Sequence, residues 1–242
     1  MSPADDPKEP TAASAPDATE QSAPDAEASA QGAVRKPYHH GRLREALIDA
    51  TLQLLEEGGP ESVTVREAGK RAGVSSGAPF RHFPTKRALL TAVAEEAIGR
   101  FRAEIEKAQK EADPDDPLAR FRAVGVAYLR YALGNPMHFR VVSDRNLIDL
   151  DGSEIFRHHN AEIQGLMNDL LEEARQRGML RQVDQTLVPL AARALVYGLA
   201  RMHVDGHLAQ WGVQPVEAER RLQAAFDLVM GSLSTSPGEF GG

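Results

Sequence analysis

Residues 64–90 read TVREAGKRAGVSSGAPFRHFPTKRALL, and this stretch decides the fold of the chain. It predicts a short helix, a tight turn, and a second short helix ahead of a long one. Thr64 and Glu67 have the spacing of a capping box, in which each side chain accepts from a backbone N–H of the other. Gly73 stands where the chain must turn, because a turn that needs a positive φ favours glycine.

The second half of the stretch predicts the partner helix and the start of the next one. Ser75 or Ser76 caps the second helix, and Pro79 then lies in its first turn, where no helical hydrogen bond is lost. Thr85 is the expected cap of the long helix, and the basic residues that follow it lie at an N-terminus, which attracts anions.

This pattern resembles the DNA-binding domain of TetR/AcrR-family transcriptional regulators. The residues that carry the resemblance are Thr64, Val65, Ala72, Gly73, Val74, Ser75, Gly77, Phe80, His82, Phe83, Lys86 and Leu89. Two departures are Ala68–Gly69, where the family has Ile-Ala, and Phe80, which replaces a tyrosine. The resemblance implies a homodimeric, ligand-responsive repressor that binds a palindromic double-stranded DNA operator.

The net charge of −7 is unevenly distributed along the chain. Residues 1–34 carry seven acids and one lysine, residues 35–87 carry ten Lys/Arg and six acids, and the remainder is acidic. Positive charge therefore gathers on the segment that carries the motif, as phosphate binding requires. An architectural protein that binds DNA without sequence preference remains an alternative, although such proteins tend to be basic throughout.

Composition narrows the remaining function classes. The chain has no cysteine, which removes disulfides and thiolate catalysis and fits a cytoplasmic protein. It lacks a signal peptide pattern, an apolar run of membrane-spanning length and the common catalytic motifs. We expect no enzyme activity, no cofactor and no membrane partner.

The expected organisation is all-α with two domains and two tails. Residues 1–34 are expected to be a disordered acidic tail, either without a role or competing with DNA, and residues 237–242 a second disordered tail. Residues 35–90 form the helix-turn-helix domain, and residues 91–236 form a helical regulatory and dimerisation domain. In the latter we expect helices over 121–133, 137–147, 154–177, 184–210 and 215–233.

The candidate DNA contacts follow from the motif, with the small residues 75–79 entering the major groove. They are Arg42, Thr64, Ser75, Ser76, Gly77, Ala78, Pro79, Phe80, Arg81, His82 and Lys86. Among these, Thr64, His82 and Lys86 are expected to hold phosphates. Arg42 ends a basic arm, residues 35–42, which could reach an adjacent groove or merely lead into the first helix.

The second domain should contain a pocket for an unidentified small-molecule inducer. Its candidate residues are Phe121, Tyr128, Tyr131, His138, His159, Met167 and Tyr197, and the wider set adds Met137, Phe156, Asn160, His203 and Trp211. The resemblance places the dimer interface on the last two helices, with candidates Ala191, Ala194, Gly198, Leu222, Phe226, Val229 and Leu233; packing within one chain is the alternative. The segment Leu195–Ala200 also resembles the C-terminal domain named for its Trp-His-Gly motif.

Histidine pairs raise a metal-responsive alternative. His203 and His207 are four residues apart and would share one face of a continuous helix. His158 and His159 are adjacent and are expected to point apart. We expect no metal site, because Asp205 lies on a different face and gives the pair His203 and His207 no obvious third ligand.

Overall fold

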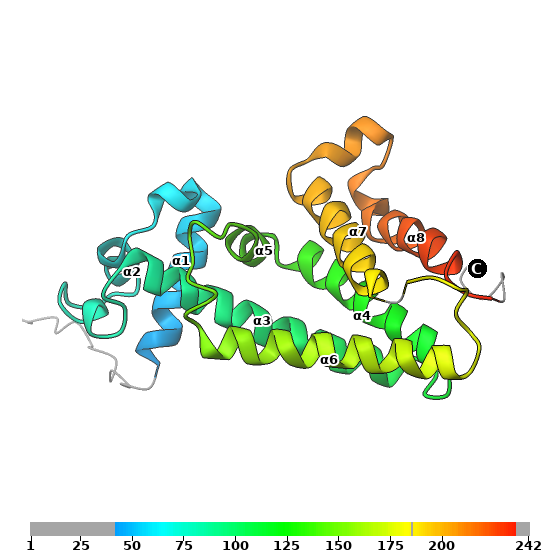
Figure 1. Cartoon of the computed structure of the whole chain (residues 1–242). Helices are drawn as coiled ribbons and strands as arrows, with labels where there is room; N and C mark the ends of the chain where they lie inside the picture. Colours follow the sequence, from blue (N-terminus) through cyan, green and yellow to red (C-terminus); the bar gives the residue numbers. More distant parts are fainter. Residues whose placement is uncertain (1–41, 185, 236–242) are drawn as a thin grey trace, which may run out of the picture. The chain divides into compact units, whose positions relative to one another are not determined.

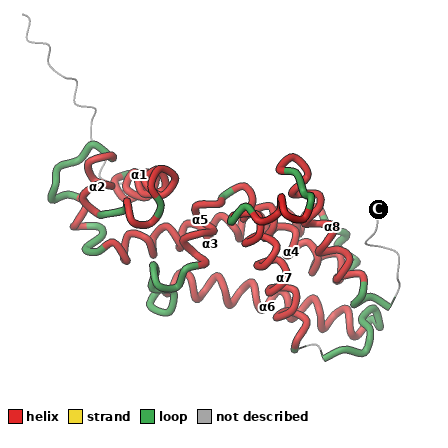
Figure 2. The backbone as a smooth tube through the Cα atoms, turned by 90° about the horizontal axis from the view of Figure 1, so that it is seen from above, coloured by secondary structure: helices red, strands yellow, loops and turns green. Residues whose placement is uncertain are grey.

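The computed structural model of the protein describes residues 42–184 and 186–235, and these fall in one compact unit. The chain is α-helical, as predicted, and in the described part the strand-like pairing is confined to an isolated bridge between Leu180 and Ser234. The helices are α1 (Leu43–Gly58), α2 (Val65–Arg71), α3 (Lys86–Glu111), α4 (Pro117–Gly134), α5 (Pro136–Ser143), α6 (Glu154–Gln176), α7 (Leu187–Val204) and α8 (Ala218–Gly231) (Figures 1 and 2).

The head of the molecule consists of α1, α2 and the first turns of α3. Its buried cluster joins Leu47 and Ile48 of α1 to Val65 of α2 and Leu90 of α3. The Thr64 hydroxyl accepts from the Glu67 backbone N–H at 3.0 Å, as expected of an N-cap. The other half of the predicted capping box is replaced, because the Glu67 carboxylate accepts from Lys70 Nζ at 3.4 Å.

The turn after α2 forms at Gly73, whose φ of 71° is the left-handed conformation predicted for it. The second short helix differs from the expectation. Residues 76–78 form a turn, and Pro79–Arg81 form a single 3₁₀ turn. Pro79 has no N–H to donate, and the surrounding bonds run between residues three apart, as from Ala78 N–H to the Ser75 carbonyl at 3.0 Å.

The body is organised around α3 and α4. The expected apolar stripe of α3, which includes Phe101 and Ile105, is buried against α4, and α4 in turn contacts α6, α7 and α8. Helix α4 begins at Pro117, with the Asp116 carboxylate accepting from two backbone N–H groups of its first turn.

Three expected helices of the body are shorter than predicted. Helix α5 ends at Ser143 instead of residue 147. Helix α7 ends at Val204 instead of residue 210, because Gly206 takes φ 76° and 3₁₀ turns follow it. Helix α8 begins at Ala218, after the 3₁₀ turn Pro215–Glu217.

A polar seam ties the loop between α5 and α6 to α3. Arg87 donates to the Ile148 carbonyl at 3.1 Å, the Thr91 hydroxyl accepts from the Asp149 N–H at 2.9 Å, and Glu95 accepts from the Ser153 hydroxyl at 2.8 Å. The three α3 residues are spaced by four, so they lie on one face of the helix. The loop is therefore fixed to the part of α3 that emerges from the head.

None of the described helices is both long and apolar enough to cross a membrane. The expectations for the tails at 1–34 and 237–242, and for the basic arm before Arg42, fall outside the described residues. The boundary predicted at residue 90 stays a prediction.

Candidate functional site

The head carries cations that have no ion-pair partner in the part of the chain that the structure describes. Arg42, Arg66 and Arg81 are exposed, Lys86 is half-buried, and none of the four has an ion-pair partner among the described residues. Arg71 differs, since both its terminal nitrogens bind the Glu57 carboxylate at 2.6 Å. These four unpaired groups are available to a polyanion.

Most of the other predicted DNA contacts are also accessible to solvent, and one is not. Thr64, Ser75, Ser76, Gly77, Phe80 and His82 are exposed, and Ala78 is half-buried. Pro79 is buried and cannot contact DNA. Its ring lies against Gly69, where an added Cβ would be only 2.2 Å from Pro79 Cγ.

This contact explains the departure from the family pattern at Gly69. A side chain at that position would push the Pro79 ring away, and with it the turn that presents residues 75–78. Gly69 and Pro79 are thus one structural unit, which we call the glycine–proline lock. The lock holds the exposed segment in place from beneath.

The body contains a cavity of about 420 Å³ between α3, α4, α6 and α7. Aromatic rings form much of its wall, and they pack against one another: Phe101 lies 5.3 Å from Tyr128, centroid to centroid, in an edge-on arrangement. Phe226 of α8 reaches the wall because Gly125 has no side chain; an added Cβ would be 2.2 Å from the Phe226 ring. A mostly apolar cavity of this size is typical of a small-molecule site.

Four of the seven predicted pocket residues line this cavity: Phe121, Tyr128, Tyr131 and Met167. Asn160 and Phe156, from the wider set, line it as well. His138 is buried beside Tyr131, with 6.5 Å between ring centroids, and Tyr197 packs on Phe139 at 5.8 Å; neither lines the cavity. His159 does not line the cavity either; it is half-buried, with its Nδ1 3.1 Å from a terminal nitrogen of Arg102 on α3.

The cavity wall is poor in charge. Arg193 is the single charged residue that lines it within the described chain, and its guanidinium lies 4.4 Å from the centroid of the Tyr128 ring. Burial raises the pKa of Tyr128, and the positive charge of Arg193 opposes that rise. The Tyr131 hydroxyl is buried without a hydrogen-bond partner in the described part of the molecule, and burial raises its pKa too.

The predicted dimer residues fall into two groups. Leu222 and Phe226 are buried within the chain, so their spacing marks an intrachain seam of α8 rather than an interface. Ala191, Ala194 and Val229 are exposed, and Gly198 and Leu233 are half-buried. Large exposed apolar side chains of the same helices are Leu187, Leu190 and Leu228, with exposed fractions of 56%, 65% and 80%.

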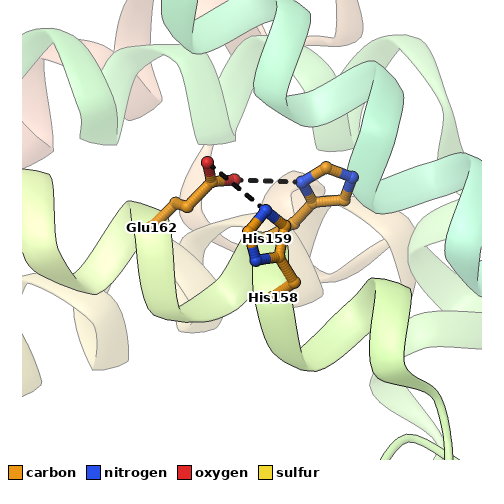
Figure 3. Close-up of side chains that lie close together, drawn as sticks. All are labelled: His158, His159 and Glu162. Atoms are coloured by element: carbon orange, nitrogen blue, oxygen red, sulfur yellow. Dashed lines mark hydrogen bonds and ion pairs between the residues drawn. The ribbon is translucent and has the colours of Figure 1, made fainter.

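Histidines come together at a place the sequence did not predict. His158 and His159 were expected to point apart, but both face Glu162, at 3.5 Å and 3.2 Å from its carboxylate oxygens (Figure 3). These three residues have the geometry of a candidate cation cluster. Arg102 of α3 already occupies it, donating to Glu162 Oε2 at 2.7 Å, and the pKa of Glu162 is lowered, first by its hydrogen bond to His159.

The arrangement joins α3 to α6 rather than leaving an open metal site. The other pair, His203 and His207, does not share a helix face, because α7 ends at Val204. The pair therefore does not present two metal ligands on one helix face, and the prediction that it would do so is wrong. Its premise, a continuous helix through residue 210, fails at Gly206.

A helix-turn-helix head with a basic face, continuous with a helical body that encloses a cavity, defines a DNA-binding regulatory protein. The family described as "Bacterial regulatory proteins, tetR family" matches residues 47–93, and "Tetracyclin repressor-like, C-terminal domain" matches residues 121–229. The chain belongs to the TetR family of transcriptional regulators, as the sequence motif predicted. The Trp-His-Gly branch stays a prediction.

Individual relatives agree with this assignment. The chain is 48% identical over 52 residues to the tetracycline repressor class C of Escherichia coli, covering 22% of this chain and 24% of that protein. It is 29% identical over 163 residues to the regulator BetI of Stenotrophomonas maltophilia, covering 67% and 78%. The TetR-family regulator PfmR of Thermus thermophilus shares the fold, with a TM-score of 0.59, 23% identity, and coverage of 77% and 95%.

Three features of the two sites were not predicted from sequence. Arg66 was overlooked, although it is an exposed cation in the first turn of α2. The contacts of Gly69 with Pro79 and of Gly125 with Phe226 depend on approach between separate elements, which spacing does not encode. Arg193 was passed over because a lone arginine on an apolar helix carries no motif.

Proposed function

We propose that the protein is a ligand-responsive homodimeric repressor that binds a palindromic DNA operator. The observation that carries this proposal is the exposed segment 75–78, held by the glycine–proline lock and flanked by unpaired cations. Small side chains allow the backbone to approach base edges, while cations bind phosphates in any sequence. Proteins that recognise a DNA sequence need both kinds of contact, to bases and to phosphates.

Individual roles follow from placement. Ser75, Ser76, Gly77, Ala78 and Arg81 would face the bases, with Phe80 beside them. Thr64, His82, Lys86, Arg42 and Arg66 would hold phosphates on either side. Pro79 has no contact with DNA and acts by supporting the segment above it.

Dimerisation would use the exposed apolar residues of α7 and α8. The inner faces of α7 and α8 are already packed within the chain, yet three large apolar side chains of these helices stay exposed to solvent: Leu187, Leu190 and Leu228. A second copy of this chain would cover them, in a four-helix arrangement with Ala191 and Ala194. Two heads would then lie about 34–36 Å apart on the duplex, one helical turn.

Regulation would couple the body cavity to the head through α3. A ligand can shift the head-to-head spacing only by as much as its affinity differs between the two arrangements. Helix α3 is suited to this role because its middle lines the cavity and its first turns belong to the head.

The test is selection of bound sequences from a random duplex library by the full-length protein, at a stated salt concentration. Recovery of a two-fold-symmetric motif, with half-sites about one helical turn apart, is the expected result. Enrichment of no sequence, with binding that only fades as salt rises, would instead indicate a non-specific DNA-binding protein.

A further inference from the structure

We propose that the ligand of the body cavity is an anionic amphiphile, with an apolar body inside the cavity and a carboxylate held by Arg193. This inference rests on the proposed function only in taking the cavity as a ligand site. It adds the chemical class of the ligand.

The distribution of polar groups over the wall is the first argument. The interior is formed by rings and aliphatic side chains, such as Phe101, Phe121 and Val124. The exposed polar side chains that line it come from the α6 and α7 side, with Arg193 on α7, Thr186 just before it, and the amides of Asn160, Gln164 and Asn168 on α6. Tyr128 and Tyr131 of α4 add two buried hydroxyls to the interior. The three amides are spaced by four and lie on one face of α6. A ligand that fits this wall has one polar end and an apolar remainder.

The sign of the charge is the second argument. No acidic side chain of the described chain lines the cavity, while a guanidinium does. Arg193 has no carboxylate partner among the described residues, and its guanidinium lies against the Tyr128 ring. A ligand carboxylate could accept two parallel hydrogen bonds from it. A cationic ligand would meet uncompensated like charge.

The position of Arg193 is the third argument for a ligand with a carboxylate. Its guanidinium lies 4.4 Å from the centroid of the Tyr128 ring, and Tyr128 belongs to the aromatic wall. The ring therefore places the cation at the boundary between the polar rim and the apolar interior. An amphiphile bound there keeps its head hydrated in part and buries its chain.

The experiment uses isothermal titration calorimetry on the full-length protein with three probes of equal chain length: decanoate, decanol and decyltrimethylammonium. Decanoate should bind about ten- to a hundredfold more tightly than decanol, as charged hydrogen bonds permit. Decyltrimethylammonium should bind most weakly.

Two variants locate the preference at one side chain. Arg193→Gln should reduce decanoate affinity to that of decanol, and Arg193→Glu should make decyltrimethylammonium the best of the three probes. Arg201→Gln, on the same helix but outside the cavity, is the matched control and should leave the order unchanged. Arg193 is exposed, so these changes leave the buried core intact.

Two results would overturn the inference. If decanol binds as tightly as decanoate, and Arg193→Gln changes neither, the site accepts apolar ligands without regard to charge. If none of the probes binds, the cavity does not take amphiphiles of this kind. Neither result touches the proposed DNA-binding function, which the selection experiment tests in the absence of ligand.

Discussion

The head and the body both bring a ring against a glycine, and the two contacts have opposite results. In the head, Pro79 fills the space above Gly69, so the segment that would meet DNA rests on a solid support. In the body, Phe226 fills the space beside Gly125 and becomes one wall of a cavity. In the head, the contact between ring and glycine fills the available space. In the body, the same kind of contact places a ring in the wall of a cavity. A surface that reads a rigid partner benefits from fixed geometry, whereas a ligand site needs unfilled volume.

The largest effect should come from removing the ring of the body contact. Phe226 is fully buried, so Phe226→Ala should lower the free energy of unfolding by about 3–5 kcal/mol. Chemical denaturation measures this. Val216→Ala, at a side chain that is 92% exposed, is the control and should change stability by less than about 0.5 kcal/mol. If Phe226→Ala changed the free energy of unfolding as little as the control does, the Phe226 ring would not contribute to the stability of the body.

The head contact should respond to an added methyl group. Gly69→Ala should lower the free energy of unfolding by about 1–3 kcal/mol, because the new Cβ overlaps the Pro79 ring. Gly99→Ala in α3 has open space around it and should be neutral or slightly stabilising. The double variant Gly69→Ala/Pro79→Ala should recover part of the loss. Full additivity of the two single changes would refute the lock.

A third experiment asks whether acid weakens the body at its buried histidine. Burial, together with the positive charge of Arg100, lowers the pKa of His138 from 6.5 to about 4. The unfolded state therefore binds a proton before the folded state does, and stability should fall as the pH drops from 6.5 toward about 4. The contribution is about 1–3 kcal/mol over that window.

The variant His138→Gln should remove that part of the pH dependence, as measured by denaturation at several pH values. His158→Gln is the control, because the His158 side chain is 66% exposed. Equal pH profiles for the protein and the His138→Gln variant would assign the acid sensitivity to other groups.

The smallest effect should be on DNA binding by one phosphate contact. Lys86→Ala should weaken binding to all duplex sequences about equally and reduce the salt dependence by about one counterion. Titrations of specific and unrelated duplexes at several salt concentrations measure both. Lys107→Ala, in the body part of α3, should leave both unchanged. A change in sequence preference would mean that Lys86 contacts a base.

The sequence predicted the head better than the body. Thr64, Gly73 and Thr85 each mark a local event, a cap or a turn, and local events are determined by neighbouring residues. The recognition segment was expected to be a helix because Pro79 is tolerated in a first turn. The structure has a 3₁₀ turn there, and its Pro79 ring packs against Gly69, ten residues earlier in the chain, a contact that spacing does not reveal.

The body was harder to predict because its function depends on contacts between distant residues. The stripe of α3 identified a core, and four pocket residues were chosen correctly as cavity-lining, but nothing in the spacing separated them from His138 or Tyr197. Leu222 and Phe226 have the same periodicity whether they face their own chain or a second copy. Burial resolved what periodicity could not.

The polar seam on α3 has a consequence for protein engineering. Arg87, Thr91 and Glu95 bind the loop between α5 and α6, so the chain segment that belongs with the head is not continuous. A chimaera cut after residue 90 would keep Arg87 but replace the loop whose Ile148 carbonyl it binds, together with Thr91 and Glu95. A biosensor that joins this head to another ligand-binding body should therefore transfer residues 42–98 together with residues 144–153.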